Sequence, residues 1–164
     1  MKKIMLVMAL ALMSAVQMNA QTTKVSDKDI VGVWTLEYMQ YDGEKKTPCG
    51  KGQKYTSFKY YGADGEYACC EIALTTKGTI RLMPHKYGKY TYKNGVYSEM
   101  GRPALKAEDM KMTDKTHFQC RWMNRIEGWK KTPMSDKAAR YIVDVCKQKE
   151  TPADIQKQLK DLLF

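Results

Sequence analysis

Histidine is scarce in this chain, and the common catalytic motifs are absent from it. Only two histidines occur in 164 residues, His85 and His117, and they lie far apart in the sequence. No G-x-S-x-G, H-E-x-x-H, phosphate-binding loop or dinucleotide-binding pattern is present. A histidine site for a metal or haem would form only if folding brought the two residues together. The sequence therefore predicts no catalytic residue, no metal site and no cofactor.

Paired cysteine motifs are also missing. The spacing of the five cysteines contains no C-x-x-C, which argues against a zinc knuckle or a thioredoxin-like site. Their odd number leaves at least one thiol unpaired within a single chain. Adjacent cysteines in a strand point to opposite faces and do not readily bridge each other. We expect mostly buried thiols with room for one disulfide, and the pairing stays open among Cys49, Cys69, Cys70, Cys120 and Cys146.

Long apolar runs are confined to the N-terminus. Two lysines precede an almost unbroken apolar run over residues 4–16, and Ala20 offers a peptidase site before Gln21. This pattern predicts a cleaved signal peptide over residues 1–20, and the run is too short for a comfortable membrane span. An uncleaved anchor is the less favoured alternative, because no stop-transfer charges follow. We expect a periplasmic or secreted protein with no stable membrane span after cleavage.

Acidic residues are fewer than basic ones, with 18 Asp and Glu against 28 Lys and Arg, for a net charge of +10. The lysines are scattered and form no block of like charge, which favours a solvated surface. A positive exported protein could still meet an anionic lipid, a glycan or an acidic small molecule. Export argues against nucleic acid as a partner.

Alternating polar and apolar residues dominate from Ile30 onward and predict β-strands. The clearest signal is a hairpin in which Asn94-Gly95 separates two tyrosine-bearing runs, because both central residues of a type I′ turn need positive φ. Short strands at this spacing indicate an antiparallel barrel or sandwich. The expected strands cover residues 30–39, 53–61, 66–74, 79–83, 89–93, 96–99, 104–112, 117–124 and 126–131.

The composition changes after Pro133. Ser135 is a plausible helix N-cap, and Thr151-Pro152 provides a second helix start. We expect a flexible segment at 21–29, a β domain at 30–134 and a helical segment of one or two helices at 135–164, packed on the β domain.

Three motifs resemble a known family. Gly32-Val33-Trp34 resembles the Gly-x-Trp of lipocalins and their calycin relatives. The hairpin over residues 88–99, and Glu127-Gly128-Trp129-Lys130-Lys131, resemble the central hairpin and closing strand of an exported, uncharacterised lipocalin-like family of gut Gram-negative bacteria. The resemblance covers about residues 30–131. It implies a mainly β fold: an antiparallel lipocalin-like barrel or half-barrel with one or two C-terminal helices.

The same resemblance implies a structural floor for the barrel. Gly32 and Trp34 would close one end, and a basic residue from near the last strand would lie over the Trp34 ring. The candidates for that basic residue are Arg121, Arg125 and Lys130, and the choice stays open. On this reading the motif supports a fold and not an activity.

Tyrosine is abundant, with eleven residues against three phenylalanines, and many lie on expected strands beside lysines. Such rings suit the wall of a binding cavity, although they also suit outer sheet faces. We expect an exported protein that binds a small apolar or amphipathic ligand, and the interleaved lysines admit an anionic one. The candidate ligand-binding residues are Tyr55, Phe58, Tyr60, Tyr90, Tyr92 and Tyr97.

Two alternatives remain. A non-catalytic envelope interaction module could contact a protein, glycan or anionic lipid surface through its sheet face or helical tail. An enzyme of unrecognised type would need a polar cleft in which groups such as Glu99, His117 or Glu127 converge. The sequence leaves the oligomeric state undetermined.

Overall fold

The computed structural model describes residues 25–50, 52–53, 55–147, 157 and 160–161. A short 3-10 helix, η1 (Asp27–Ile30), leads into the strands, and the helix α2 (Asp136–Cys146) follows them. The strands among these described residues are β1 (Gly32–Tyr41), β2 (Thr47–Pro48), β3 (Tyr55–Tyr61), β4 (Glu66–Leu74), β5 (Ile80–Lys93), β6 (Val96–Glu99), β7 (Met110–Asp114), β8 (His117–Trp122) and β9 (Arg125–Lys131).

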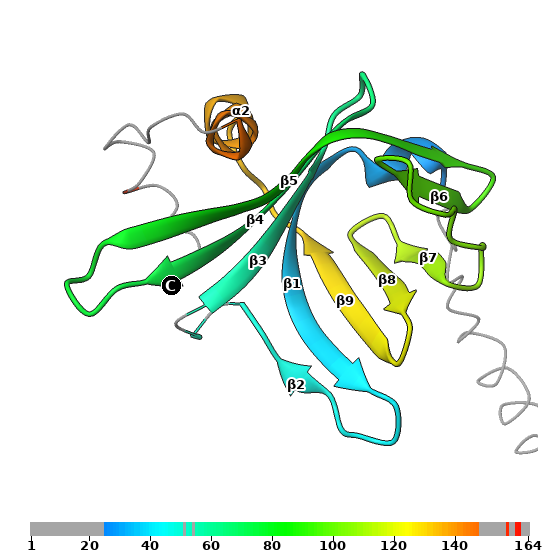
Figure 1. The fold of residues 1–164 in the computed structure, drawn as a ribbon, viewed down its shortest axis with the longest axis horizontal. Coiled ribbons are helices and arrows are strands. Elements are labelled where there is room, and N and C mark those ends of the chain that lie inside the picture. Colours follow the sequence, from blue (N-terminus) through cyan, green and yellow to red (C-terminus); the bar gives the residue numbers. More distant parts are fainter. Residues whose placement is uncertain (1–24, 51, 54, 148–156, 158–159, 162–164) are drawn as a thin grey trace, which may run out of the picture.

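The strands pair antiparallel in the order β6-β5-β4-β3-β1-β9-β8-β7. The short strand β2 pairs with the C-terminal part of β1, at Tyr38 and Met39. The sheet curls so that β7, β8 and β9 face β5 and β6 across the interior (Figure 1). After β6, which is one edge strand of the sheet, the chain pairs back with it through an isolated bridge between Tyr97 and Leu105. The result is a nearly closed antiparallel barrel, which confirms the expected fold class.

The central hairpin forms as the Asn-Gly signal predicts. Asn94 and Gly95 both have positive φ, +52° and +76°, between β5 and β6. Two separate strands were expected before this turn, but β5 runs unbroken from Ile80 to Lys93. The register between β4 and β5 shifts here, since Cys70 pairs with Pro84 and Cys69 with Lys86, and bulges of this kind are places where sheets tolerate proline.

Several other strand boundaries differ from the expectation by one or more residues, and two of them show how turns set the strand ends. The strand expected at 104–112 is reduced to the single bridge at Leu105 followed by β7, which starts at Met110. The strand expected at 117–124 ends at Trp122, because Met123 adopts a φ of +54° in the turn between β8 and β9. Turn geometry decides both boundaries.

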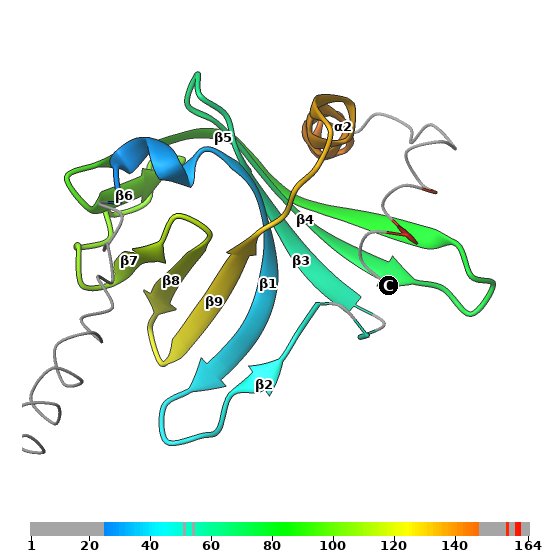
Figure 2. The ribbon, with the colours of Figure 1, turned by 180° about the vertical axis from the view of Figure 1, so that it is seen from behind.

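The sheet has an apolar cluster on each face. The outer cluster joins Val33, Phe58 and Ile72 to the buried face of α2, which carries Ala138 and Ile142. Figure 2 shows α2 lying across the outside of the β3–β5 region. The side chain of Ser135 caps the helix by accepting the N–H of Ala138 at 3.3 Å. The second helix expected from Thr151 falls outside the described residues.

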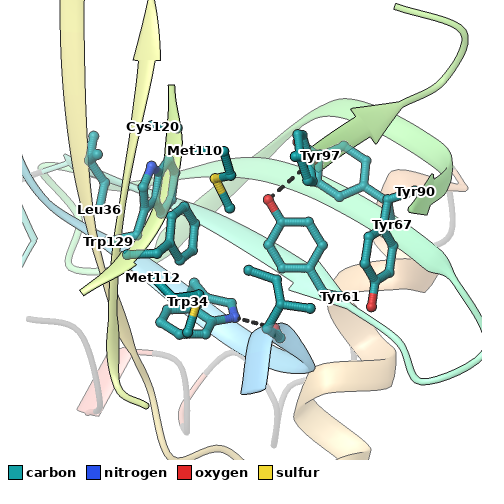
Figure 3. Packing of buried hydrophobic residues seen from close by; sticks show 12 residues of the cluster. Trp34, Leu36, Tyr61, Tyr67, Tyr90, Tyr97, Met110, Met112, Cys120 and Trp129 are labelled. Carbon is teal, nitrogen blue, oxygen red and sulfur yellow. Dashed lines mark hydrogen bonds between the residues drawn. The ribbon is translucent and has the colours of Figure 1, made fainter. Parts of the chain in front are cut away.

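The inner cluster fills one end of the barrel with aromatic rings (Figure 3). The ring of Phe118 meets Trp34 edge-on at 4.7 Å and stacks on Trp129 at 5.9 Å between centroids. The indole N–H of Trp34 donates to the carbonyl oxygen of Ile30 at 2.7 Å. This end of the barrel is therefore a solid core. Within the described part of the chain, no helix is long and apolar enough to cross a membrane.

Candidate binding pocket at the open end of the barrel

The other end of the barrel holds a pocket of about 490 Å³. It lies toward the last residues of β1 and the turn between β8 and β9, away from Trp34. Apolar and aromatic side chains supply part of its wall, namely Leu36, Met39, Tyr67, Trp122, Met123 and Trp129. Charged side chains supply the rest, including Lys59, Lys86, Arg102 and Arg125 together with Glu71, Glu99 and Glu127. A ligand here would meet apolar surface and charge together.

Lys59 is the cation buried in this pocket. Its side chain is only 7% exposed, and the ammonium lies 4.3 Å from the centroid of the Trp129 ring. Burial is the largest influence on Lys59 and opposes its charged form, but the pKa of Lys59 is raised overall by its neighbours. At neutral pH the neighbour among them that favours the ammonium is the ionised carboxylate of Glu127.

The hydrogen-bonding capacity of Lys59 is poorly used. Its Nζ lies 3.6 Å from Glu127 Oε2, beyond normal hydrogen-bond distance, and 4.0 Å from the sulfur of Cys120. Burial raises the pKa of Cys120 to about 12, so this partner is a neutral thiol and a weak acceptor. Apart from the long contact with the Cys120 sulfur and the ion pair with Glu127, the ammonium has no oxygen acceptor within 3.5 Å among the described residues.

Glu127 is better satisfied than the lysine that faces it. Its two oxygens accept from the guanidinium of Arg125 and from the indole N–H of Trp129, the latter at 3.2 Å. Burial alone would raise the pKa of Glu127, but Lys59 and Arg125 lower it overall. The carboxylate is ionised at neutral pH and has its own partners.

A second charged group surrounds Glu99, which is 2% exposed. Its carboxylate accepts from Lys86 Nζ at 2.8 Å and from the Tyr97 hydroxyl at 2.7 Å, and Arg102 lies 3.8 Å away. Burial raises the pKa of Glu99, and the Lys86 and Tyr97 hydrogen bonds lower it by more. The Tyr97 oxygen in turn accepts from Tyr61 at 3.2 Å, which joins the pocket to the solid core (Figure 3).

The fold does not unite the two histidines. His85 contacts Glu71 at 2.9 Å beside the pocket, whereas His117 contacts Asp114 at 2.9 Å in the turn between β7 and β8. No group of three or more potential metal ligands occurs among residues whose placement the structure describes.

The candidate ligand-binding residues are divided between the two faces of the sheet. Phe58 and Tyr60 belong to the outer cluster with α2, because alternate residues of β3 point out of the barrel. Tyr90 and Tyr97 are buried in the inner core, and Tyr92 packs against that core. None of these five lines the pocket. Tyr55 belongs to β3, but its side chain falls outside the described residues.

The pocket residue that sequence reasoning missed is Lys59. It lies between two outward-facing aromatic residues of β3 and shares the inward parity of Ser57 and Tyr61. A lysine on the buried parity of a strand is the signal that could have identified it. Glu99 and Glu127, considered only as parts of an unrecognised enzyme site, also lie in this pocket.

At the barrel floor, Gly32 and Trp34 lie where the resemblance implied, but the basic partner is Lys131. Its ammonium is 5.3 Å from the Trp34 ring centroid and donates to the carbonyl oxygen of Asp29 at 2.8 Å. A Cβ on Gly32 would lie 2.8 Å from Lys131 Cε, so glycine makes room for this side chain.

The expected partners of Trp34 lie elsewhere. Arg121 pairs with Asp42 at 2.7 Å, and Lys130 is exposed. The cause is the register between β1 and β9, which places Lys131 directly across from Trp34 and Lys130 across from Thr35. Directly opposed residues share a face, and a position one residue away does not.

Comparisons with known proteins find a likeness among solved structures. No protein-family model and no curated protein matches the chain. Among solved structures, the chain is similar to a lipocalin-like protein from Bacteroides uniformis, with 16% sequence identity and a TM-score of 0.41. The alignment covers 63% of this chain and 98% of that one. The assignment of a nearly closed antiparallel barrel rests on the strand pairing itself.

Proposed function

We propose that this barrel binds a small amphipathic molecule whose acidic group meets Lys59 and whose apolar part lies against the aromatic wall. The observation that carries the proposal is the buried ammonium of Lys59, whose contacts among the described residues are a weak one with the Cys120 sulfur at 4.0 Å and an ion pair with Glu127 at 3.6 Å, with no oxygen acceptor in hydrogen-bond distance. Buried polar groups are normally satisfied, so an acceptor supplied by a ligand would complete this one.

The size and wall chemistry of the pocket support the same proposal. Its volume of about 490 Å³ lies in the range of small-molecule sites. Leu36 and Trp129 offer apolar surface close to the lysine, which matches a ligand with an acidic end and a hydrocarbon or ring body. The pocket carboxylates have closer basic partners than Lys59: Glu71 contacts His85, Glu99 pairs with Lys86, and Glu127 pairs with Arg125. Lys59 reaches only Glu127, at 3.6 Å, so a ligand carboxylate could make a shorter contact with it.

The proposed role is binding in an envelope or extracellular compartment. The basic and apolar leader over residues 1–20 supports export of the chain. The paired charges support a binding site without a reaction step, because no nucleophile with an adjacent base stands out among the pocket residues. A carrier or scavenger of an acidic amphipathic metabolite fits these features.

Direct binding of a fluorescent fatty acid tests the proposal. The protein is titrated with cis-parinaric acid and, separately, with its methyl ester, and Kd is compared for the wild type, Lys59→Met and the control Lys111→Met. A charge-assisted hydrogen bond of about 1.5–3 kcal/mol predicts roughly 10- to 100-fold weaker binding of the acid by Lys59→Met. Lys111 is exposed on β7, so its replacement should leave Kd unchanged.

The ester supplies the second control. It should bind the wild type and Lys59→Met about equally, because it has no carboxylate to pair with the ammonium. Equal binding of the acid by the wild type and Lys59→Met would overturn the assigned role of Lys59. Native mass spectrometry of protein purified from its own host is the complementary test, and an apo spectrum together with a captured envelope partner would favour an interaction module.

A further inference from the structure

Two cysteines far apart in the sequence meet on the outer face of the barrel. Cys70 comes from β4 and is fully buried in the outer cluster, and Cys146 is the last residue of α2 and packs against the same cluster. The two thiols are close enough to shift each other's pKa. The sulfur of Cys146 also lies 3.4 Å from the carbonyl oxygen of Cys69. The sulfur atoms are thus neighbours before any bond joins them.

The remaining cysteines lie elsewhere. Cys69 lines the pocket inside the barrel, because neighbouring residues of β4 point to opposite faces. Cys120 is buried inside beside Lys59. Cys49 packs against the inner cluster near β2. All five cysteines are free thiols in this structure.

We propose that Cys70 and Cys146 are the site of an intrachain disulfide that fastens α2 to β4. The oxidant is a disulfide of another molecule, of the small-molecule glutathione class or of a thiol-oxidising protein. The Cys146 thiolate attacks one sulfur of that disulfide, and the other sulfur leaves as a thiolate. The Cys70 thiol then loses its proton and attacks the mixed disulfide at Cys146, which releases the second thiolate. The protein loses two hydrogens and two electrons, and the oxidant gains them.

The environment of the pair sets the order of attack. Cys146 is half-buried at a helix end, whereas Cys70 is sealed beneath α2, so an external disulfide can reach Cys146 first. The interaction with Cys70 lowers the pKa of Cys146, and the same interaction together with burial raises the pKa of Cys70. Cys146 is the attacking thiol, and Cys70 is the resolving thiol.

The disulfide would strengthen the attachment of α2 to the barrel. The proposal does not depend on whether the pocket binds the proposed ligand. The disulfide would close a long loop that contains every strand from β5 to β9. Constraining such a loop in the unfolded chain stabilises the folded state more than a short loop does. Reduction would leave α2 held by its apolar face and by its ion pairs with Glu66.

Thiol counting tests the assignment. The purified full-length chain is incubated with oxidised glutathione, free thiols are blocked with N-ethylmaleimide under denaturing conditions, and the added mass is read on the intact protein. The oxidised wild type should take up two maleimides fewer than the fully reduced protein. Cys69→Ser should show the same loss of two, whereas Cys70→Ser should lose only the one maleimide that a glutathione adduct at Cys146 blocks, and Cys146→Ser should lose none. Cys69→Ser is the matched control, because it changes the neighbouring residue and leaves the pair intact.

Two further measurements make the result decisive. Cys70→Ser should accumulate a glutathione adduct at Cys146, because the resolving thiol is gone. Dithiothreitol should lower Tm of the oxidised wild type by about 5–15 °C and leave Tm of Cys146→Ser unchanged. Full maleimide labelling of the oxidised wild type would overturn the proposal. So would a loss of two maleimides that persists in Cys70→Ser and disappears in Cys69→Ser.

Discussion

Glu66 is the main polar connection between the barrel and α2. Its carboxylate, at the start of β4, accepts from the Tyr87 hydroxyl at 2.8 Å and from Lys147 Nζ at 3.2 Å, and it pairs with Arg140 of the helix. Burial raises the pKa of Glu66, but these hydrogen bonds lower it by more, to about 2. We predict that Glu66→Gln weakens the fold at neutral pH and much less in acid.

The magnitude follows from linkage. A pKa of about 2 in the folded state against 4.5 in the unfolded state corresponds to at most about 3.4 kcal/mol. Solvent screens part of this, because the Arg140 side chain is 54% exposed, so we expect about 1–2 kcal/mol. Since the folded-state pKa is depressed, this stability is fully present above pH 4.5 and is lost as the pH falls toward 2.

Urea unfolding of the wild type and Glu66→Gln measures this difference. The difference in the free energy of unfolding should be about 1–2 kcal/mol at pH 7 and should fall to roughly half by pH 3. Taking the difference between the two proteins removes the titration of the other carboxylates, and Glu108→Gln, at an exposed position, is the control for a surface amide substitution. A difference that does not change between pH 7 and pH 3 would refute the role of the ionised carboxylate.

Two further predictions concern the solid end of the barrel. Phe118→Ala removes a fully buried ring that contacts Trp34 and Trp129, and it should lower the free energy of unfolding by about 3–5 kcal/mol in urea titrations. Lys131→Met should cost about 0.5–2 kcal/mol and shift tryptophan emission, because its ammonium lies over the Trp34 ring. The neighbouring Lys130→Met should do neither, and equal effects of the two substitutions would contradict the register between β1 and β9.

Local sequence signals predicted the elements of the fold well. The Asn94-Gly95 turn, the alternating strands and the Ser135 cap depend on residues close to one another in the chain, and the structure confirms all three. Strand boundaries that depend on pairing with a neighbouring strand were predicted less well. β5 continues through Pro84 beside a shift in its register with β4, and that shift cannot be read from the sequence of β5 alone.

The residues that line the pocket could not be predicted from the sequence of a single strand. Alternation along β3 separates Phe58 and Tyr60 from Lys59, but it does not say which set lies inside the barrel. That choice follows from α2, which covers the outer face and makes aromatic residues there part of a core. With a helix on the outside, both faces of the sheet are apolar, and aromatic content no longer distinguishes a cavity wall from an outer core.

By itself the sequence determined a mainly β chain with one clear hairpin, a capped helix after Pro133 and a Gly-x-Trp strand. These features follow from backbone preferences and side-chain periodicity, which act over a few residues. The tertiary structure alone decided that Lys131 lies over Trp34, that Lys59 lies in the pocket, and that Cys70 meets Cys146. Each depends on strand register or helix docking between distant segments, where a shift of one residue turns a side chain to the opposite face.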